Sequence, residues 1–230
     1  MIKYLALLLP LAGCATQGTS SSQYTLGSRS TVVNEATVDG SYGAVWDSLV
    51  RDLAKSFYVI NNIDKESRII NVSFSSSDAE EYVDCGRTQR TFTDGGVTES
   101  FNYAVAAKST FKVAASRQEH PSMSNYSVFR RESQLEGRAN IYIAPVAGDL
   151  GKTTVSVNAR YVLSTKVRGE AFAKHVSGNI LARGRSPDET YTYTFNTAGT
   201  GSLDAGSGVT VTCFSKGKLE GEVLAFLAKR

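Results

Sequence analysis

Histidine is almost absent from this 230-residue chain, which has only His120 and His175, each alone in a polar stretch. A zinc site needs several His or Cys ligands at short spacing, and the sequence has no such group. A Ser-His-Asp set would have to come from distant residues, and no Gly-x-Ser-x-Gly elbow marks a nucleophile. The sequence therefore predicts a protein that is not an enzyme, with no catalytic residue, no metal ligand and no cofactor.

The loop patterns that hold phosphate or calcium are also missing. The glycine-rich segments 94–96 and 199–208 lack Gly-Lys-Ser/Thr and do not lead from a strand into a helix, so we expect turn glycines. Four acidic residues lie close together in the sequence: Asp78, Glu80, Glu81 and Asp84. Their spacing differs from that of an EF-hand, and a solvated, capped turn is expected.

Charge of one sign is not in excess. The chain has 25 basic and 22 acidic residues, and removing residues 1–13 takes away Lys3 alone, which leaves a net charge of +2. This balance excludes the electrostatic footprint of a nucleic-acid binder. One loose basic stretch contains Lys166, Arg168, Lys174, Arg183 and Arg185. A solvated loop is expected there, and contact with anionic lipid headgroups or lipopolysaccharide is the alternative.

Long apolar runs are missing as well, except for a short one at the N-terminus that ends in Leu11-Ala12-Gly13-Cys14. Lys3 supplies a positive start, and the run is too short for the roughly 20 residues of a membrane span. The tetrapeptide resembles the lipobox of bacterial lipoproteins, in which the cysteine is lipidated and becomes the mature N-terminus. The resemblance implies acyl chains on Cys14. Because Ala15 is not aspartate, it also implies an outer-membrane anchor with the domain facing the periplasm.

We therefore expect three segments: a signal peptide over residues 1–13, a lipidated flexible tether over residues 14–29, and one periplasmic α+β domain over residues 30–230. Residues 16–30 read TQGTSSSQYTLGSRS and hold too little apolar area to offset the entropy of ordering them. A plain secretory signal that happens to carry a cysteine is the alternative to the lipid anchor.

Beyond Cys14 the chain has two cysteines, Cys85 and Cys213. In an oxidising compartment such a pair favours a disulfide. In the chain-entropy model, closing so long a loop stabilises the fold by about 4–5 kcal/mol. Two buried thiols are the alternative, and the lack of Cys-x-x-Cys spacing argues against a reactive pair.

Hydrophobic periodicity predicts an α+β fold. Residues 30–75 predict a strand (30–38), a helix (45–54) and a hairpin (57–63 and 68–75). The helix is the clearest element, because apolar residues recur at helical spacing: Val45, Trp46, Leu49, Val50, Leu53 and Ala54.

In the second half, strong alternation predicts a hairpin of residues 134–146 and 153–164. Further strands are expected over 191–196 and 209–214, with a last helix after Ser215. Tyr191, Tyr193 and Phe195 share one strand face, where core or cross-strand packing is expected rather than an exposed aromatic stripe. Residues 115–131 suggest a loop, and residues 165–186 give no clear pattern. We expect an antiparallel sheet packed by an N-terminal and a C-terminal helix.

The N-terminal segment TVVNEATVDGSYGAVWDSLVRDLAKSFYVINNIDKESRIINVSF resembles the helix-grip or TBP-like units of the C subunit of the outer-membrane β-barrel assembly machinery. The resemblance covers about 45 residues and implies a helix-grip/TBP-like domain in a scaffolding lipoprotein without catalytic residues.

These observations together predict a non-catalytic envelope scaffold or accessory subunit. It would be held to the outer membrane by its lipid, and its partner would be an envelope protein complex rather than nucleic acid. The alternative is a periplasmic lipid or small-ligand binding module. A pocket of roughly 300–1,000 Å³ would favour the ligand, whereas a filled core with an exposed apolar patch would favour a protein partner.

Overall fold

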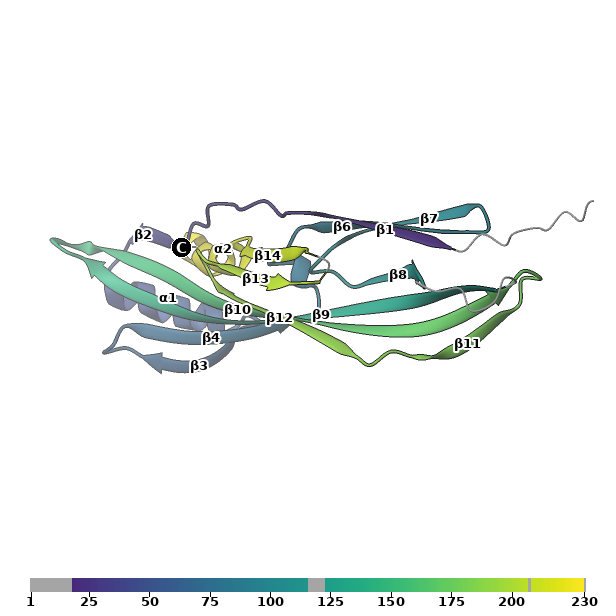
Figure 1. Cartoon of the computed structure of the whole chain (residues 1–230). Coiled ribbons are helices and arrows are strands. Elements are labelled where there is room, and N and C mark those ends of the chain that lie inside the picture. Colours follow the sequence, from purple (N-terminus) through teal and green to yellow (C-terminus); the bar gives the residue numbers. More distant parts are fainter. Residues whose placement is uncertain (1–17, 116–122, 207, 230) are drawn as a thin grey trace, which may run out of the picture.

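A long antiparallel hairpin runs along the length of the molecule (Figure 1). The computed structural model describes residues 18–115, 123–206 and 208–229. The hairpin consists of β9 (Met123–Val146) and β10 (Asp149–His175), which pair along almost their whole length, from Val146 opposite Asp149 to Met123 opposite His175. Since a strand rises about 3.3 Å per residue, the 27 residues of β10 span about 85 Å, which makes the molecule elongated.

Shorter strands line both edges of this hairpin and complete an eight-stranded sheet. Three strands pair in succession with β10: β2 (Glu35–Asp39), β12 (Glu189–Asn196) and β11 (Ile180–Arg185). Two pair with β9: β4 (Ile69–Ser76) and β8 (Ser109–Ala114). Outside β4 lies β3 (Val59–Asp64), the edge strand on that side.

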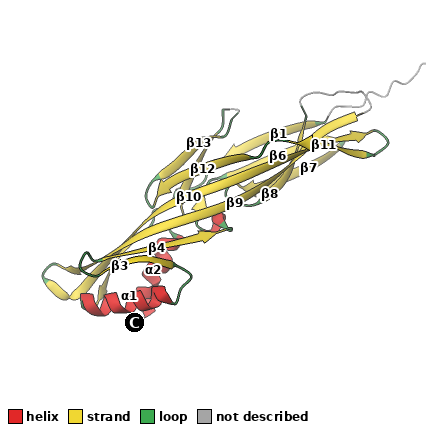
Figure 2. Cartoon of the chain, turned by 90° about the horizontal axis from the view of Figure 1, so that it is seen from below, coloured by secondary structure: helices red, strands yellow, loops and turns green. Residues whose placement is uncertain are grey.

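Two three-stranded sheets and two α-helices complete the described residues. One sheet has the order β1 (Thr19–Thr25), β6 (Arg87–Asp94), β7 (Val97–Ala104). The other has the order β13 (Thr200–Asp204), β14 (Thr210–Ser215), β5 (Val83–Asp84). The helices are α1 (Tyr42–Ala54) and α2 (Lys218–Ala225), with 3-10 turns at Ala79–Glu81 and Phe226–Lys229. Both α-helices lie at the same end of the long hairpin (Figure 2).

The main core lies at the helical end. Alternation along the hairpin turns the side chains of Ile141 and Val157 inward, whereas those of Asn140 and Asn158 face solvent. Against this inner face α1 packs its apolar stripe, in which Val45, Leu49 and Leu53 are buried. The predicted helix is therefore present and faces the core as expected.

A second buried group lies toward the other end, outside the main cluster. There the β1–β6–β7 sheet faces the part of the large sheet that contains β8 and β9. Aromatic rings meet between the two sheets, with Phe92 and Tyr126 5.5 Å apart between centroids and Tyr103 and Phe111 also 5.5 Å apart. This part of the molecule is a β-sandwich.

The predicted α+β, helix-grip/TBP-like fold is wrong. Strands make up 62% of the structure and helices 13%, with two short α-helices where terminal helices covering the sheet were expected. The error arose in polar segments. Residues 123–131 lie in the expected loop but extend β9, and residues 165–175 extend β10. Both are partly exposed on each face, so neither shows a clean two-residue alternation.

The expected tether also differs from the structure. Thr19–Thr25, within the segment 14–29, form β1, which pairs with β6 along its whole length from Thr19 opposite Thr93 to Thr25 opposite Arg87. Its side chains are mostly exposed, so the strand is held by backbone hydrogen bonds rather than by an apolar face, and composition alone does not reveal it.

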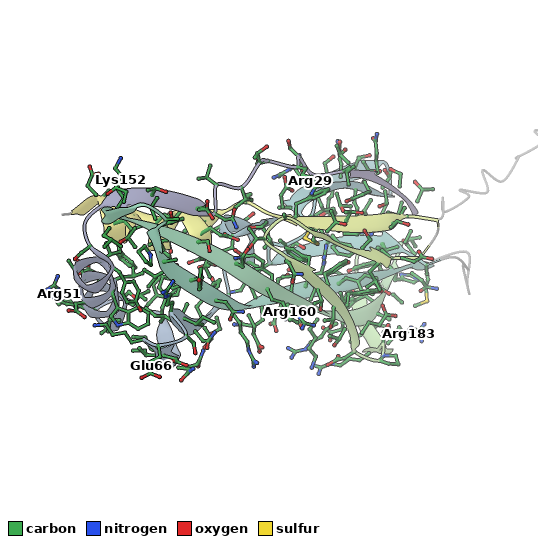
Figure 3. All side chains as sticks on the ribbon, turned by 90° about the vertical axis from the view of Figure 1, so that its left-hand side faces the viewer. Arg29, Arg51, Glu66, Lys152, Arg160 and Arg183 are labelled. Carbon is green, nitrogen blue, oxygen red and sulfur yellow. A yellow bond between two sulfur atoms is a disulfide. The ribbon has the colours of Figure 1, made fainter. Side chains whose placement is uncertain are left out.

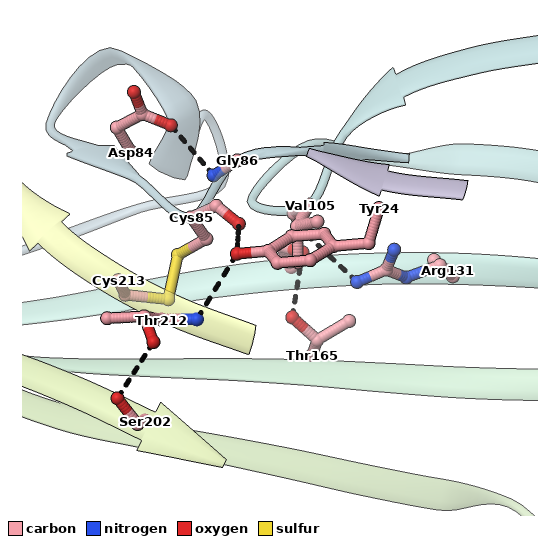
Figure 4. Close-up of a disulfide and its surroundings, with 11 residues drawn as sticks. Tyr24, Asp84, Cys85, Gly86, Val105, Arg131, Thr165, Ser202, Thr212 and Cys213 are labelled. Atoms are coloured by element: carbon pink, nitrogen blue, oxygen red, sulfur yellow. Dashed lines mark hydrogen bonds between the residues drawn. A yellow bond between two sulfur atoms is a disulfide. The ribbon is translucent and has the colours of Figure 1, made fainter. Parts of the chain in front are cut away.

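The predicted disulfide between Cys85 and Cys213 is present, and both cysteines are buried in the main core (Figure 4). It ties β14 to the segment that leads into β6. Tyr24 of β1 packs beside it and donates its hydroxyl hydrogen to the carbonyl of Cys85, with a distance of 3.1 Å. The backbone N–H of Thr212 donates in turn to the Tyr24 hydroxyl oxygen at 3.3 Å. The alternative of two buried thiols does not apply.

Candidate functional site: an aromatic cleft between two sheets

A cleft of about 460 Å³ lies between the β1–β6–β7 sheet and the strands β8, β9 and β12. We call it the aromatic cleft, because six rings line it: Tyr24, Tyr103, Phe111, Phe129, Tyr191 and Tyr193. Aliphatic side chains such as Val105 and Val209 fill the space between the rings, and Arg90, Arg131 and Glu189 are its charged residues. The site is therefore an apolar slot with a few fixed polar groups.

Three neighbouring strands supply a continuous stack of rings. Tyr103 of β7, Phe111 of β8 and Phe129 of β9 stack in this order, with 5.5 Å between successive centroids and interplanar angles of 11° and 23°. Such offset stacking holds each ring in place beyond the effect of burial alone. The stack therefore bridges the two sheets and forms one wall of the cleft, with Tyr103 from the β1–β6–β7 sheet and Phe111 and Phe129 from the large sheet.

Two guanidinium groups are fixed against this wall. Arg90 donates from Nε to the Tyr103 hydroxyl at 2.9 Å, and its Cζ lies 4.5 Å from the centroid of Phe111. Arg131 donates from Nη2 to the carbonyl of Val105 at 2.9 Å, and its Cζ lies 5.3 Å from the centroid of Tyr103. Over the described part of the chain, neither guanidinium is in a salt bridge, so both positive charges remain uncompensated by a carboxylate contact.

Elsewhere in the cleft, β12, which belongs to the same sheet as β8 and β9, contributes two phenols. Tyr191 donates its hydroxyl hydrogen to Glu189 at 2.5 Å, and this hydrogen bond, together with burial, raises the pKa of Tyr191 to about 12. Burial raises the pKa of Tyr193, and the positive charge of nearby Arg131 offsets part of that rise. Both phenols therefore stay protonated at neutral pH and present neutral O–H groups to the cleft.

The predicted shared face of Tyr191, Tyr193 and Phe195 is present, but it serves two places. Phe195 enters the main core and stacks on Tyr161 with 5.5 Å between centroids. Tyr193 is buried, and with Tyr191 it lines the aromatic cleft. Core packing, the expected role, is therefore right for Phe195 and Tyr193, and Tyr191 packs against the same core; the two tyrosines line the cleft in addition.

The other residues singled out in the sequence are dispersed. His175 lies at the end of β10 and its Nδ1 is 2.8 Å from the Ser177 hydroxyl, while His120 and Cys14 lie outside the described residues. No group of three or more His, Cys, Asp or Glu residues that would suit a metal occurs in the parts the structure describes. The absence of catalysis and of a cofactor stays a prediction.

The acidic cluster has structural partners. Glu81 forms an ion pair with Lys218, and Asp84 accepts hydrogen bonds from the backbone N–H groups of Ser28 and Gly86 at 3.0 and 2.8 Å. The contact with Lys218 lowers the pKa of Glu81. These carboxylates fix the loop around the disulfide. The expected turn is present at Ala79–Glu81, but the expected side-chain cap is not.

All five residues of the basic stretch lie in strands, so the expected solvated loop is wrong. Lys166 and Arg168 of β10 both form ion pairs with Asp188, at 2.9 and 3.5 Å, and Lys174 pairs with Asp94 at 3.2 Å. The remaining two residues, Arg183 and Arg185, lie in β11, which is exposed along its whole length.

Sequence reasoning missed Arg90 and Arg131. Each occupies an inward-facing strand position, since Arg90 lies between Thr88 and Phe92 on one face of β6 and Arg131 follows Phe129 by two residues on β9. A charged residue in the apolar phase of an alternating strand is the signal that marks them. A loop was expected over residues 115–131, so the sequence did not indicate whether Arg131 faces inward or outward on a strand.

A second hollow, of about 610 Å³, lies on the outer face of the hairpin. Its polar wall consists mainly of Asn34, Arg138, Asn140, Asn158, Arg160 and Asn196. Its asparagines bond across strands, with Asn34 Nδ2 3.1 Å from Asn158 Oδ1, and Arg160 lies on the outer surface (Figure 3). It lacks the enclosing aromatic walls of the cleft.

No protein-family model matches the chain, and neither a curated protein nor a solved structure matches it. The resemblance to the C subunit of the β-barrel assembly machinery therefore stays a prediction. Within the described ranges, neither helix has the length and apolar character needed to cross a membrane.

Proposed function

We propose that this chain is a lipid-anchored envelope protein whose domain binds a small amphipathic ligand in the aromatic cleft. The observation that carries the proposal is the cleft itself. Its volume of about 460 Å³ lies within the usual range of ligand sites, roughly 300–1,000 Å³. Its apolar walls and few oriented polar groups are also typical of such sites.

The chemistry of the walls selects the class of ligand. The stack of Tyr103, Phe111 and Phe129 suits a flat ring or an acyl chain, which would gain the apolar contact of a preformed surface. Within the described residues Arg90 and Arg131 form no salt bridge, and they suit a carboxylate or phosphate group. We therefore propose an anionic amphiphile, such as a fatty acid or a phospholipid fragment, as the ligand.

The cellular address is part of the same proposal. Lipidation of Cys14, anchorage in the outer membrane and exposure of the domain to the periplasm rest on the lipobox-like segment. The disulfide between Cys85 and Cys213 supports an oxidising compartment, because such bonds persist outside the reducing cytosol.

Binding of laurate to the mature chain tests the proposal. The Cys14→Ala chain, exported through an ordinary secretory signal, is dialysed against labelled laurate and, separately, dodecylamine. We expect laurate to bind and dodecylamine to bind at least about tenfold more weakly, a difference of 1.4 kcal/mol, because Arg90 and Arg131 outnumber the single acidic residue of the cleft, Glu189. Equal binding of the two probes, or binding of neither, would contradict the proposal.

Neighbouring arginines on β9 provide a matched pair of variants. Arg131→Ala removes a cleft charge and should weaken laurate binding about tenfold, whereas Arg130→Ala removes an exposed charge and should leave binding unchanged. Arg131→Lys keeps the charge and distinguishes its loss from the loss of the hydrogen bond to Val105.

A second candidate function, a scaffold within an envelope protein complex, is favoured by the edge strand β3. This strand and the residues just before it expose apolar side chains, Phe57, Val59 and Ile63, at the open side of the large sheet. An exposed edge of this kind can accept a strand from a partner. In-cell crosslinking of the full-length lipoprotein, beside Val59→Lys and Cys14→Ala, tests it. Recovery of one envelope complex that both substitutions abolish would favour the scaffold.

A further inference from the structure

One end of the elongated domain gathers the start of β1 and two turns, and we call it the proximal end. A Cβ added to Gly18 would lie 3.2 Å from the carbonyl oxygen of Thr93 and 3.4 Å from the Ser124 hydroxyl, so the chain arrives beside the ends of β6 and β9. The ion pair between Lys174 and Asp94 joins the end of β10 to the same place. Figure 1 shows the start of β1, the β6–β7 turn and the β10–β11 turn together at this end, opposite the helices.

Large apolar side chains are exposed on these turns. Val97 in the β6–β7 hairpin is 67% exposed and Val176 after β10 is 68% exposed. On β11, Ile180 and Leu181 are 55% and 52% exposed. All six residues of β11 are exposed, and Arg183 and Arg185 follow the apolar pair along the strand. Apolar residues at a tip with basic residues beside them are suited to a lipid interface, where the stems lie among the headgroups and the charges near phosphates.

The length of chain between Cys14 and Gly18 makes this end the one that meets the bilayer. Four residues of fully extended chain reach about 14 Å at most. The hairpin, by contrast, extends about 85 Å, judged from the 27 residues of β10. With Cys14 lipidated, the proximal end must therefore lie close to the membrane surface, whereas the helical end is placed there only if the domain lies flat. This step rests on the lipid anchor of the proposed function.

We infer that the proximal end docks on the phospholipid surface, with Ile180 and Leu181 among the headgroups. Arg183 and Arg185 then lie near lipid phosphates, whose negative potential attracts basic groups beside a membrane. The domain stands upright, and its helical end, which carries the open β3 edge, projects away from the bilayer.

Tryptophan quenching in vesicles of brominated phosphatidylethanolamine and phosphatidylglycerol tests the orientation. Ile180→Trp reports on the proximal end and Leu150→Trp, at an exposed position in the opposite hairpin turn, is the matched control. The natural tryptophan, Trp46 of α1, is buried and gives a constant background. For the full-length lipidated protein we expect bromine to quench the emission added by Ile180→Trp at least about threefold more than that added by Leu150→Trp.

Two outcomes of the quenching experiment would contradict the inference, and two further measurements separate docking from lipid anchoring. Equal quenching at both positions would mean that the domain lies flat, and no quenching for Ile180→Trp in lipidated protein would mean that it stands off the surface. Either result overturns the inference. The mass of the purified protein reports separately whether Cys14 carries acyl chains. If it does not, the Ile180→Trp variant of the unlipidated chain is mixed with the same vesicles at low salt, where quenching supports docking and its absence refutes it.

Discussion

Removing the bond between Cys85 and Cys213 should destabilise the fold by about 5 kcal/mol in the chain-entropy model, because the bond closes a loop with a sequence separation of 128 residues. For a domain of this size, 1 kcal/mol shifts the melting temperature by roughly 2–4 °C, so reduction should lower it by about 10–20 °C. The destabilisation arises mainly in the unfolded state, because the unfolded chain has more conformational entropy once the loop is open.

Urea denaturation of the wild-type protein with and without reductant measures this loss directly. The reduced protein keeps both sulfur atoms in the main core, so it separates loop closure from the packing changes that Cys85→Ser and Cys213→Ser also cause. We expect a lower urea midpoint and a steeper dependence on urea after reduction, because the reduced unfolded chain exposes more surface.

Superimposable curves for oxidised and reduced protein would refute this reasoning. A reduction in stability that appears only in the two serine variants, and not in the reduced wild type, would assign the effect to packing in the core. The control is to confirm, by thiol labelling in denaturant, that the reduced sample is free of disulfide.

Four further substitutions test particular residues. Tyr161→Phe removes the donor to the buried Glu220 carboxylate, 2.8 Å away, and should cost about 1–3 kcal/mol in urea denaturation. Gly137→Ala should cost a similar 1–3 kcal/mol because its Cβ would overlap a buried ring, whereas Gly221→Ala, with open space on α2, should stabilise by about 0.5–1 kcal/mol. Spectrophotometric titration should show one phenol near pH 12 that Tyr191→Phe removes. Since folding raises this pKa above 10, its contribution to stability is complete below pH 10 and is lost as the pH rises toward 12.

Hydrophobic periodicity was sufficient to predict a helix or strand where one face of that element is buried. The helix α1 and the central parts of β9 and β10 place apolar residues on the core side and polar residues outside, and their periods of 3.6 and 2 residues are legible in the sequence. The ends of the same two strands have partly exposed residues on both faces, so no period distinguishes them from loops. The prediction therefore stopped the hairpin short at one end, and the α+β fold class followed from that error.

The aromatic cleft was beyond reach of the sequence for a different reason. Its residues come from eight strands and the loops between them, spread between Ser22 and Val211, and they meet only because β1 and β6 lie over β8 and β9. What the sequence does show is a charged side chain at a strand position where an apolar one is expected, as for Arg90 and Arg131, which face inward. A charge in that phase must find a partner or a ligand, since burying it alone is costly.

The two ends of the molecule are packed with different side chains, and the cleft lies where they meet. Branched aliphatic side chains such as Ile141, Val155 and Leu163 belong to the main core. The sandwich instead stacks rings between its sheets, with Arg90 and Arg131 against them. Both groups line the cleft, since Val105, Tyr193 and Val211 belong to the main core and Tyr103 and Phe111 do not. An amphiphilic anion, the proposed ligand, would therefore meet aliphatic side chains, stacked rings and two guanidinium groups in one site.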